Sequence, residues 1–146
     1  MKKVLVSLIA LVLIVPVVGC EKVKGNYKEG TYTGSVIDTY GGEENEATAK
    51  VVVDKNGMIE SVYLDTAYHG STKKTLKEDY NMKKYRPDAA GEWYEQVEKL
   101  ENAVVENQGT DFLKLNDEGK TDAVSGCTIK IDALVKALNQ ALEQAK

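Results

Sequence analysis

The chain has 146 residues, of which 19 are basic and 23 acidic, giving a formal net charge of −4 at pH 7. An acidic protein is not expected to bind nucleic acid or to adhere by charge to an anionic membrane. Its two cysteines and single histidine do not supply the ligand sets of zinc, iron–sulfur or c-type haem sites, so the sequence predicts no metal centre. The length suits one folded domain.

Residues 1–19 have the pattern of a secretory signal. Two lysines precede an apolar run over residues 4–18, which is shorter than the about 20 residues of a transmembrane helix. The run ends in Val17-Val18-Gly19-Cys20, which resembles the lipobox of bacterial lipoproteins. The resemblance implies cleavage before Cys20 and attachment of a diacylglyceryl group to its sulfur, whose two acyl chains anchor a protein stably. The alternatives are an ordinary signal peptide that contains a cysteine and an uncleaved anchor.

Loss of residues 1–19 makes the mature chain more acidic. Because this segment contains two lysines and no acidic residue, the mature chain has 17 basic and 23 acidic residues and a charge of −6. Attachment to a membrane then depends on the lipid. Residues 20–29 are expected to form the lipidated cysteine and a polar tether that reaches about 30 Å when extended. Cys127 is the only other cysteine, so no internal disulfide is expected.

Three strands are predicted between residues 30 and 67. Residues 30–38 alternate small or apolar residues with Thr and Ser, and residues 47–53 place their apolar residues on one face. Asn56-Gly57 is typical of a tight hairpin turn, so residues 58–67 are expected to return antiparallel to the preceding strand. The expected result is a three-stranded antiparallel meander.

Helices are predicted in the rest of the chain. Residues 71–82 suit a short helix, and Pro87 closes that stretch. A longer helix is expected over residues 89–105, where apolar residues recur at three- and four-residue steps before Gly109. The last helix has an apolar stripe of Ile131, Leu134, Val135, Leu138, Ala141 and Leu142. The predicted fold class is α+β, a small antiparallel sheet packed by two or three helices, in a single domain over residues 30–146.

The segment before the last helix has the clearest chemical signal. Residues 122–129 have the sequence Asp-Ala-Val-Ser-Gly-Cys-Thr-Ile, a glycine-containing turn that is expected to deliver Ser125 and Thr128 to a helix N-terminus. Unpaired backbone N–H groups at such a terminus stabilise a phosphate, and Gly126 lets a ligand approach closely. The alternative is that these hydroxyl groups cap the helix, and the spacing alone favours capping.

The same residues resemble the flavinylation motif of FMN-binding domains, Asp-x-x-Ser/Thr-Gly-Ala-Ser/Thr. Such domains occur in sodium-pumping NADH:quinone reductases, in ferredoxin:NAD reductase complexes and in surface lipoproteins for extracellular electron transfer. The resemblance implies that an FMN transferase, using FAD and magnesium, recognises Asp122, Ser125 and Gly126 and joins FMN through its phosphate to Thr128. Cys127 replaces the usual alanine and is expected to be a small apolar filler, with a catalytic or sensing thiol beside the flavin as the alternative.

Other parts of the chain also resemble Gram-positive members of this family, namely residues 30–67, 71–76, 80–82 and 91–94. Leu76, Met82 and Trp93 are candidates for an apolar wall against the isoalloxazine ring, although a purely core role is favoured for Leu76 and Trp93. Lys73 and Lys74 are expected to be a solvated pair, with contact to the flavin phosphate or carbonyl groups as the alternative.

These features together predict an extracytoplasmic electron carrier with covalent FMN, anchored by lipid at the outer face of the cytoplasmic membrane or at the cell surface, with a Gram-positive setting favoured. The expected partners are an FMN transferase during maturation and a membrane redox complex or reductase as electron donor or acceptor. No nicotinamide site, quinone site or nucleophilic triad is recognisable, so an electron-transfer flavoprotein is favoured over an independent enzyme. The alternatives are a small flavin oxidoreductase acting directly on a soluble acceptor and a flavin-free binding or assembly lipoprotein.

Overall fold

The computed structural model describes residues 24–146. The signal peptide and the lipidation site predicted within residues 1–20 lie outside this range, and within it no helix is long and apolar enough to cross a membrane. The elements follow in the order β1 (Gly30–Tyr40), β2 (Glu43–Val53), β3 (Ile59–Tyr68), β4 (Ser71–Thr72), α1 (Lys73–Leu76), η1 (Lys77–Tyr80), α2 (Met82–Tyr85), α3 (Trp93–Asn107) and α4 (Asp132–Gln144).

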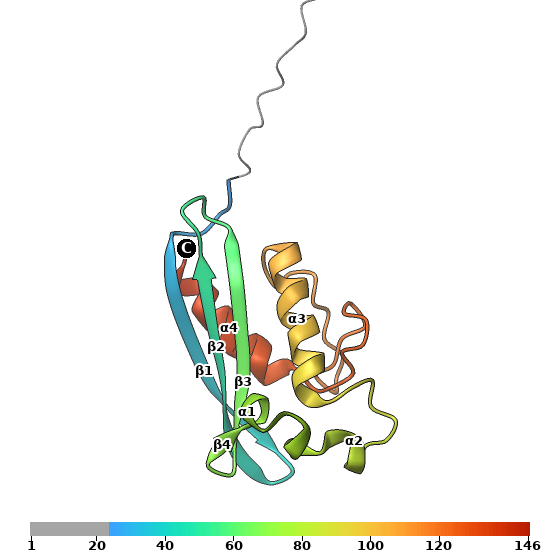
Figure 1. The fold of residues 1–146 in the computed structure, drawn as a ribbon. Coiled ribbons are helices and arrows are strands. Elements are labelled where there is room, and N and C mark those ends of the chain that lie inside the picture. Colours follow the sequence, from blue (N-terminus) through green and yellow to red (C-terminus); the bar gives the residue numbers. More distant parts are fainter. Residues whose placement is uncertain (1–23) are drawn as a thin grey trace, which may run out of the picture.

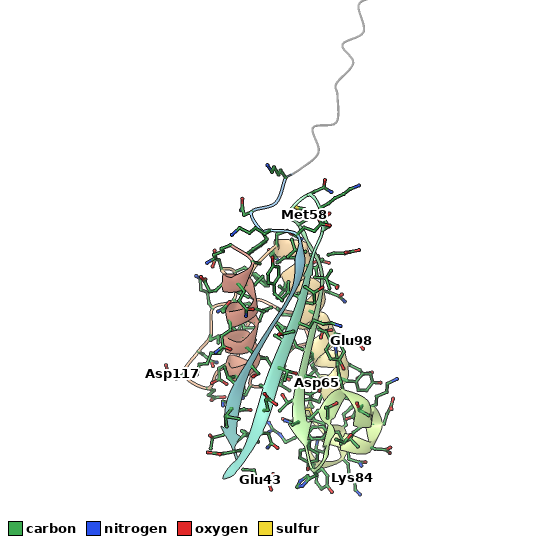
Figure 2. All side chains as sticks on the ribbon, turned by 90° about the vertical axis from the view of Figure 1, so that its left-hand side faces the viewer. Glu43, Met58, Asp65, Lys84, Glu98 and Asp117 are labelled. Atoms are coloured by element: carbon green, nitrogen blue, oxygen red, sulfur yellow. The ribbon has the colours of Figure 1, made fainter. Side chains whose placement is uncertain are left out.

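Strands β1, β2 and β3 form the predicted antiparallel meander, and the two-residue β4 pairs with the end of β3. On β2, Ala47, Ala49, Val51 and Val53 are buried while Lys50 is exposed, as the two-residue period of a strand requires. One face of the sheet therefore meets the core and the other meets solvent (Figure 2). The α+β class with one small antiparallel sheet is confirmed.

Helices α3 and α4 pack on the buried face, α4 against β1 and β2 and α3 against β3 (Figure 1). Both follow the predicted apolar stripes, because their buried residues recur at three- and four-residue steps. Helix α4 lies very close to the sheet at Gly34 of β1. An added Cβ on this residue would come within 2.1 Å of the Ala137 carbonyl oxygen on α4. A glycine at this position is therefore what allows α4 to lie directly on the sheet.

The β2–β3 hairpin turns at Asn56-Gly57, as predicted. Gly57 has a φ of +78°, which glycine adopts without steric cost, and its N–H donates to the carbonyl oxygen of Asp54 at 2.9 Å. The Asp54 carboxylate accepts the backbone N–H groups of Asn56 and Met58 at 2.8 and 2.9 Å. Met58 and Glu43 mark opposite ends of the sheet (Figure 2).

The chain is held against the domain from Gly25 onward. The Gly25 N–H donates to the carbonyl oxygen of Asn56 at 2.8 Å, and the Lys28 N–H donates to that of Ala145 at 2.7 Å. Residues 25–29, expected to be part of a free tether, are therefore tied to the β2–β3 hairpin and to the end of α4. The folded part of the chain begins before the first strand.

The segment expected to form one short helix over residues 71–82 is instead broken into short pieces. Strand β4 is followed by the single turn α1, the 3₁₀ helix η1 and the single turn α2. Lys77 and Asn81 have φ values of +49° and +56°, which a right-handed helix does not tolerate. The prediction of a continuous helix is wrong here because the positive φ of Lys77 and Asn81 interrupts it, and α1 and η1 pack separately against α3.

Side chains from the two long helices cover both edges of the sheet. At β1, Gln144 of α4 donates to the Thr33 carbonyl oxygen at 2.7 Å, and Gln140 accepts the Ser35 N–H at 3.2 Å. An edge strand otherwise presents unpaired backbone groups that invite pairing with another chain. The amide side chains of α4 therefore occupy part of the position of a further strand.

At the other edge of the sheet, side chains of α3 and of its C-cap residue bind the backbone of β3. Gln108 accepts the Ile59 N–H at 2.6 Å and donates to the Ile59 carbonyl oxygen at 2.9 Å. The Glu101 carboxylate accepts the Leu64 N–H at 2.5 Å. Helix α3 is thereby fixed along the length of the strand by bonds to its backbone, in addition to apolar packing.

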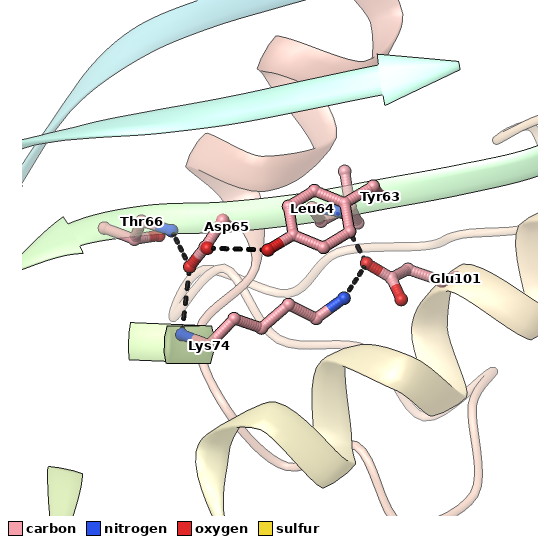
Figure 3. A network of polar contacts seen from close by, with 6 residues as sticks. All are labelled: Tyr63, Leu64, Asp65, Thr66, Lys74 and Glu101. Atoms are coloured by element: carbon pink, nitrogen blue, oxygen red, sulfur yellow. Dashed lines mark hydrogen bonds and ion pairs between the residues drawn. The ribbon is translucent and has the colours of Figure 1, made fainter. Parts of the chain in front are cut away.

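Glu101 also belongs to a buried polar network (Figure 3). Its carboxylate pairs with the Lys74 ammonium at 2.5 Å, and each side chain is only 10% exposed. The Asp65 carboxylate accepts the backbone N–H groups of Thr66 at 2.8 Å and Lys74 at 3.1 Å and the Tyr63 hydroxyl at 3.1 Å. The network ties α1 to β3 and α3. Lys74, expected at the surface, is an internal ion-pair partner.

We expect Gly34→Ala to lower the free energy of unfolding by about 1–3 kcal/mol, because the methyl group meets backbone atoms of α4 rather than a flexible side chain. Urea titration followed by circular dichroism measures the change. Ser35→Ala is the matched control, since this neighbouring side chain is exposed, and its effect should stay within about 0.5 kcal/mol. Equal stability of Gly34→Ala and the wild type would contradict the close packing of α4 on β1.

Burial raises the pKa of the Glu101 carboxyl, against the opposing hydrogen bonds from Lys74 and Leu64. A carboxyl whose pKa is higher in the folded state binds its proton more tightly when folded. Its contribution to stability is therefore fully present below the unfolded-state pKa of about 4.3 and is lost as the pH rises through the folded-state pKa.

Wild-type stability relative to Glu101→Gln is accordingly expected to decrease as the pH rises above about 4, the unfolded-state pKa. The glutamine keeps an acceptor for Leu64 and Lys74 but removes the titration and the negative charge that pairs with Lys74, so the pH dependence of the difference, not its size at one pH, reports the pKa of Glu101. Urea titrations at each pH measure this difference, with Glu106→Gln, an exposed position of α3, as the control. A relative stability that rises over the same range would show that the ion pair outweighs the burial.

Candidate functional site

The motif of residues 122–128 lies in the loop between α3 and α4. This loop is attached to the core at several points. The side chains of Val124, Cys127 and Ile129 are buried. Leu115 and Thr121 form an isolated antiparallel bridge. These contacts hold an irregular segment in one place without a helix or a strand.

The core of the motif is a β-turn. The Cys127 N–H donates to the Val124 carbonyl oxygen at 3.1 Å, and Gly126, at the third position of the turn, has a φ of +75°. A type II turn requires a positive φ at this position, which explains the glycine. The Lys99 side chain of α3 lies over the turn, because an added Cβ on Gly126 would be 2.5 Å from the Lys99 Nζ.

The turn directs the polar motif side chains outward. Asp122, Ser125 and Thr128 are exposed, whereas Cys127 beside Thr128 is 2% exposed. The side chains that the resemblance assigns to recognition and attachment are thus accessible to a second macromolecule.

Thr128 is held by a residue that the sequence did not single out. Gln96 of α3 is fully buried, and its Oε1 accepts the backbone N–H of Thr128 at 2.8 Å and the Thr128 hydroxyl at 3.1 Å. At its other end, Gln96 Nε2 donates to the Gly91 carbonyl oxygen at 2.8 Å. A signal was present in the sequence, since Gln96 is a polar residue on an apolar stripe that contains Trp93 and Leu100.

Thr128 does not lie at a helix N-terminus, contrary to expectation. Helix α4 begins at Asp132 and its N-cap is Ile131, so Thr128 precedes the helix by a short irregular stretch. This stretch places Ile129 and Ile131 in the core before the helix begins. The group that binds the Thr128 backbone and hydroxyl is the Gln96 amide, which replaces both the capping role and the helix-terminus role that the spacing suggested.

The predicted wall residues lie at different depths. Met82 is half-buried, and its sulfur lies 3.9 Å from Gln96 Nε2. Met82 is therefore close to the glutamine that binds Thr128. Trp93, one helical turn before Gln96, is 5% exposed and belongs to the core, as the core interpretation expected. Leu76 is half-buried at the end of α1, which packs against α3.

Lys73 is enclosed by aromatic rings and is not a solvated residue. Its ammonium lies 5.2 Å from the ring centre of Tyr80 and 5.4 Å from that of Trp93, distances at which a cation is attracted to a ring face. Burial lowers the pKa of Lys73, with Asp38 and Asp65 acting in the opposite direction. A half-buried cation therefore lies beside one of the predicted wall residues.

Cys127 has the properties of a structural residue. Burial raises the pKa of its thiol to about 11, so the nucleophilic thiolate is scarce at neutral pH. The filler interpretation fits this environment better than a reactive or sensing thiol.

Two surface hollows lie away from the motif. One is on the open face of the sheet, with Lys50, Tyr63 and Gln140 among its lining residues, and the other is beside the start of β1. Neither is lined by a motif residue. The chemical feature of the motif is therefore an exposed threonine on a fixed loop, which suits a group attached from outside.

Comparison with known proteins gives one match. A family model described as FMN-binding domain matches residues 28–143 of the chain. The match begins just before β1, includes the motif loop and ends within α4. No curated protein and no solved structure matches the chain.

Proposed function

The chain belongs to the FMN-binding domain family, and on this premise we propose that it is an extracytoplasmic, membrane-anchored electron carrier with FMN joined covalently to Thr128. Membership of the family indicates a flavin-binding domain with a role in electron transfer. The phosphoester to Thr128, the lipid anchor and the location outside the cytoplasm belong to the proposal.

The observation that carries the proposal is the exposure of Thr128 on a fixed loop. A residue that accepts a bulky phosphate ester must stand clear of the protein, and Thr128 is exposed although Cys127 and Ile129 on either side are buried. Its backbone is bound to Gln96 at 2.8 Å. An attached group would therefore start from a fixed point and still have room outside the core.

The charge near the turn also fits a phosphoester. The Lys99 ammonium lies directly over Gly126, two residues from Thr128. A phosphodiester is an anion, and an opposite charge at close range stabilises it, although a partly exposed pair contributes only modestly. Lys99 would therefore favour the attached state without being required for attachment.

FMN supplies the electron chemistry when bound, and the protein sets its position and surroundings. Met82 and Leu76 are half-buried and are the wall residues with surface to offer, whereas Trp93 supports the site mainly from within the core. Lys73 over the Trp93 ring would add positive charge beside this wall residue.

The proposed anchor would keep the domain close to the membrane. Cys20 precedes Gly25, the first residue tied to the domain, by five positions, which span at most about 17 Å. Two acyl chains on Cys20 would anchor the protein stably. A short tether raises the effective concentration of the domain near a membrane redox complex or reductase, its proposed electron donor or acceptor.

We expect Thr128→Ala to abolish covalent FMN after co-expression with an FMN transferase. The substitution removes the hydroxyl and its bond to Gln96 but keeps the backbone N–H bond, so the free energy of unfolding should change by no more than about 1.5 kcal/mol. Intact mass and peptide mapping around residue 128 measure attachment, and urea titration measures stability.

The matched control is Thr31→Ala, an exposed threonine of β1, which should keep the full FMN mass. FMN remaining on the Thr128→Ala chain would move the attachment to another residue. An unmodified wild-type chain, with a transferase that labels a control acceptor, would sink the proposed linkage.

Cys20→Ala is expected to prevent lipid attachment and leave the flavin in place, because the two modifications are on separate parts of the chain. Metabolic labelling with a fatty-acid analogue, followed by separation of membrane and soluble fractions, measures the anchor. Continued labelling of the variant would refute the lipobox prediction. In-gel flavin fluorescence of the same samples serves as the internal control.

A further inference from the structure

The Gln96 amide has a single possible orientation. The Thr128 N–H can only donate and the Gly91 carbonyl oxygen can only accept, so Oε1 faces Thr128 and Nε2 faces Gly91. In many structures the two ends of a glutamine amide are hard to distinguish, but here both backbone partners determine the assignment. Because Gln96 is fully buried, its oxygen cannot exchange these partners for water.

The orientation of the amide determines the role of the Thr128 hydroxyl. An amide oxygen has no proton to give, so the 3.1 Å contact between Thr128 Oγ and Gln96 Oε1 requires the hydroxyl to be the donor. The lone pairs of Oγ are then left for a group outside the protein. Thr128 as a whole is exposed to solvent.

We propose that Gln96 is a positioning residue for flavin attachment, an inference that rests on the proposed link of FMN to Thr128. Its amide oxygen holds the backbone and the hydroxyl of Thr128 at one point of an irregular loop and presents Oγ to the transferase. Correct placement of a nucleophile is worth orders of magnitude in rate, and a misplacement of about 1 Å costs about 100-fold.

The transfer step has a simple balance. Thr128 Oγ forms a bond to the FMN phosphorus of FAD, the bond from that phosphorus to the bridging pyrophosphate oxygen breaks, and AMP leaves with this oxygen. The O–H first turns away from the buried Gln96 Oε1, and its proton then passes to a base of the transferase. Gln96 accepts no proton, because a neutral amide is not a base near neutral pH. Its role is confined to orienting Thr128.

The two bonds to Gln96 have different fates. After attachment, Oγ has no proton, so Oγ and Gln96 Oε1 become two acceptors that repel each other at 3.1 Å, and this contact opens. The Thr128 N–H bond to the same oxygen is unaffected. Gln96 therefore holds the loop in both states but holds the hydroxyl only before attachment.

The test measures transferase kinetics on the purified unmodified protein with FAD and magnesium. Gln96→Ala is expected to lower kcat for flavinylation by about tenfold or more. The KM for the protein acceptor should stay within about twofold, because Asp122, Ser125 and Gly126 on the surface are unchanged. A loss caused only by partial unfolding would lower the concentration of competent acceptor and raise the apparent KM instead.

Gln108→Ala is the matched control. Gln108 is a glutamine at the other end of the same helix and makes the same kind of bonds to a distant backbone, here that of Ile59. It is expected to lose stability in urea titration while keeping the wild-type kcat. Equal loss of kcat in both variants would assign Gln96 a purely structural role and overturn the proposal.

A measurement on the wild type covers the case in which Gln96→Ala does not fold. Thr128 is exposed and outside any helix or strand, yet its N–H is bound to a buried oxygen, so NMR should show amide exchange at least about 100-fold slower than in an open loop. Unprotected exchange would overturn the proposed geometry.

The outcomes separate the two proposals. A flavinylated wild type with an unchanged kcat for Gln96→Ala would refute the role of Gln96 and leave the attachment at Thr128 intact. A wild type that the active transferase does not label would overturn the attachment itself and the role of Gln96 with it.

Discussion

Two polar side chains on helix α3 and one on its C-cap residue bind backbone groups that lie outside the helix, and the rest of the structure depends on them. Gln96 binds the motif loop at Thr128, Glu101 binds β3 at Leu64, and Gln108 binds β3 at Ile59. A buried backbone group without such a partner costs about as much as a lost hydrogen bond. Through these bonds α3 connects the motif loop to the edge strand β3.

The same helix divides the molecule into a rigid frame and an accessible surface. Apolar packing of α3 and α4 on one face of the sheet forms the frame, while the polar motif side chains are exposed on a loop whose residues Val124, Cys127 and Ile129 are buried. A covalently held cofactor does not need a deep pocket to prevent its dissociation. The covalent attachment proposed for FMN would therefore explain why the motif is open to solvent.

The three lysines near the site differ in the groups that surround them. Lys74 is committed to Glu101 in the interior, whereas Lys73 has aromatic neighbours and Lys99 lies over the turn. Charge near a flavin is one of the means by which a protein tunes its electronics. Of the three lysines, Lys73 and Lys99 are therefore the ones with charge to offer a bound anion.

The sequence by itself determined the strand meander, the Asn56-Gly57 hairpin, the two long helices and the identity of the motif residues, because these features depend on local periodicity, turn chemistry or a short pattern. Only the tertiary structure decided which groups meet: Gln96 and Thr128 are 32 positions apart, and Glu101 and Leu64 are 37 apart. It also broke the predicted helix over residues 71–82 and placed Thr128 before α4 rather than at its start. Periodicity describes one element at a time, whereas these outcomes depend on burial and hydrogen bonding between elements that only the folded chain brings together.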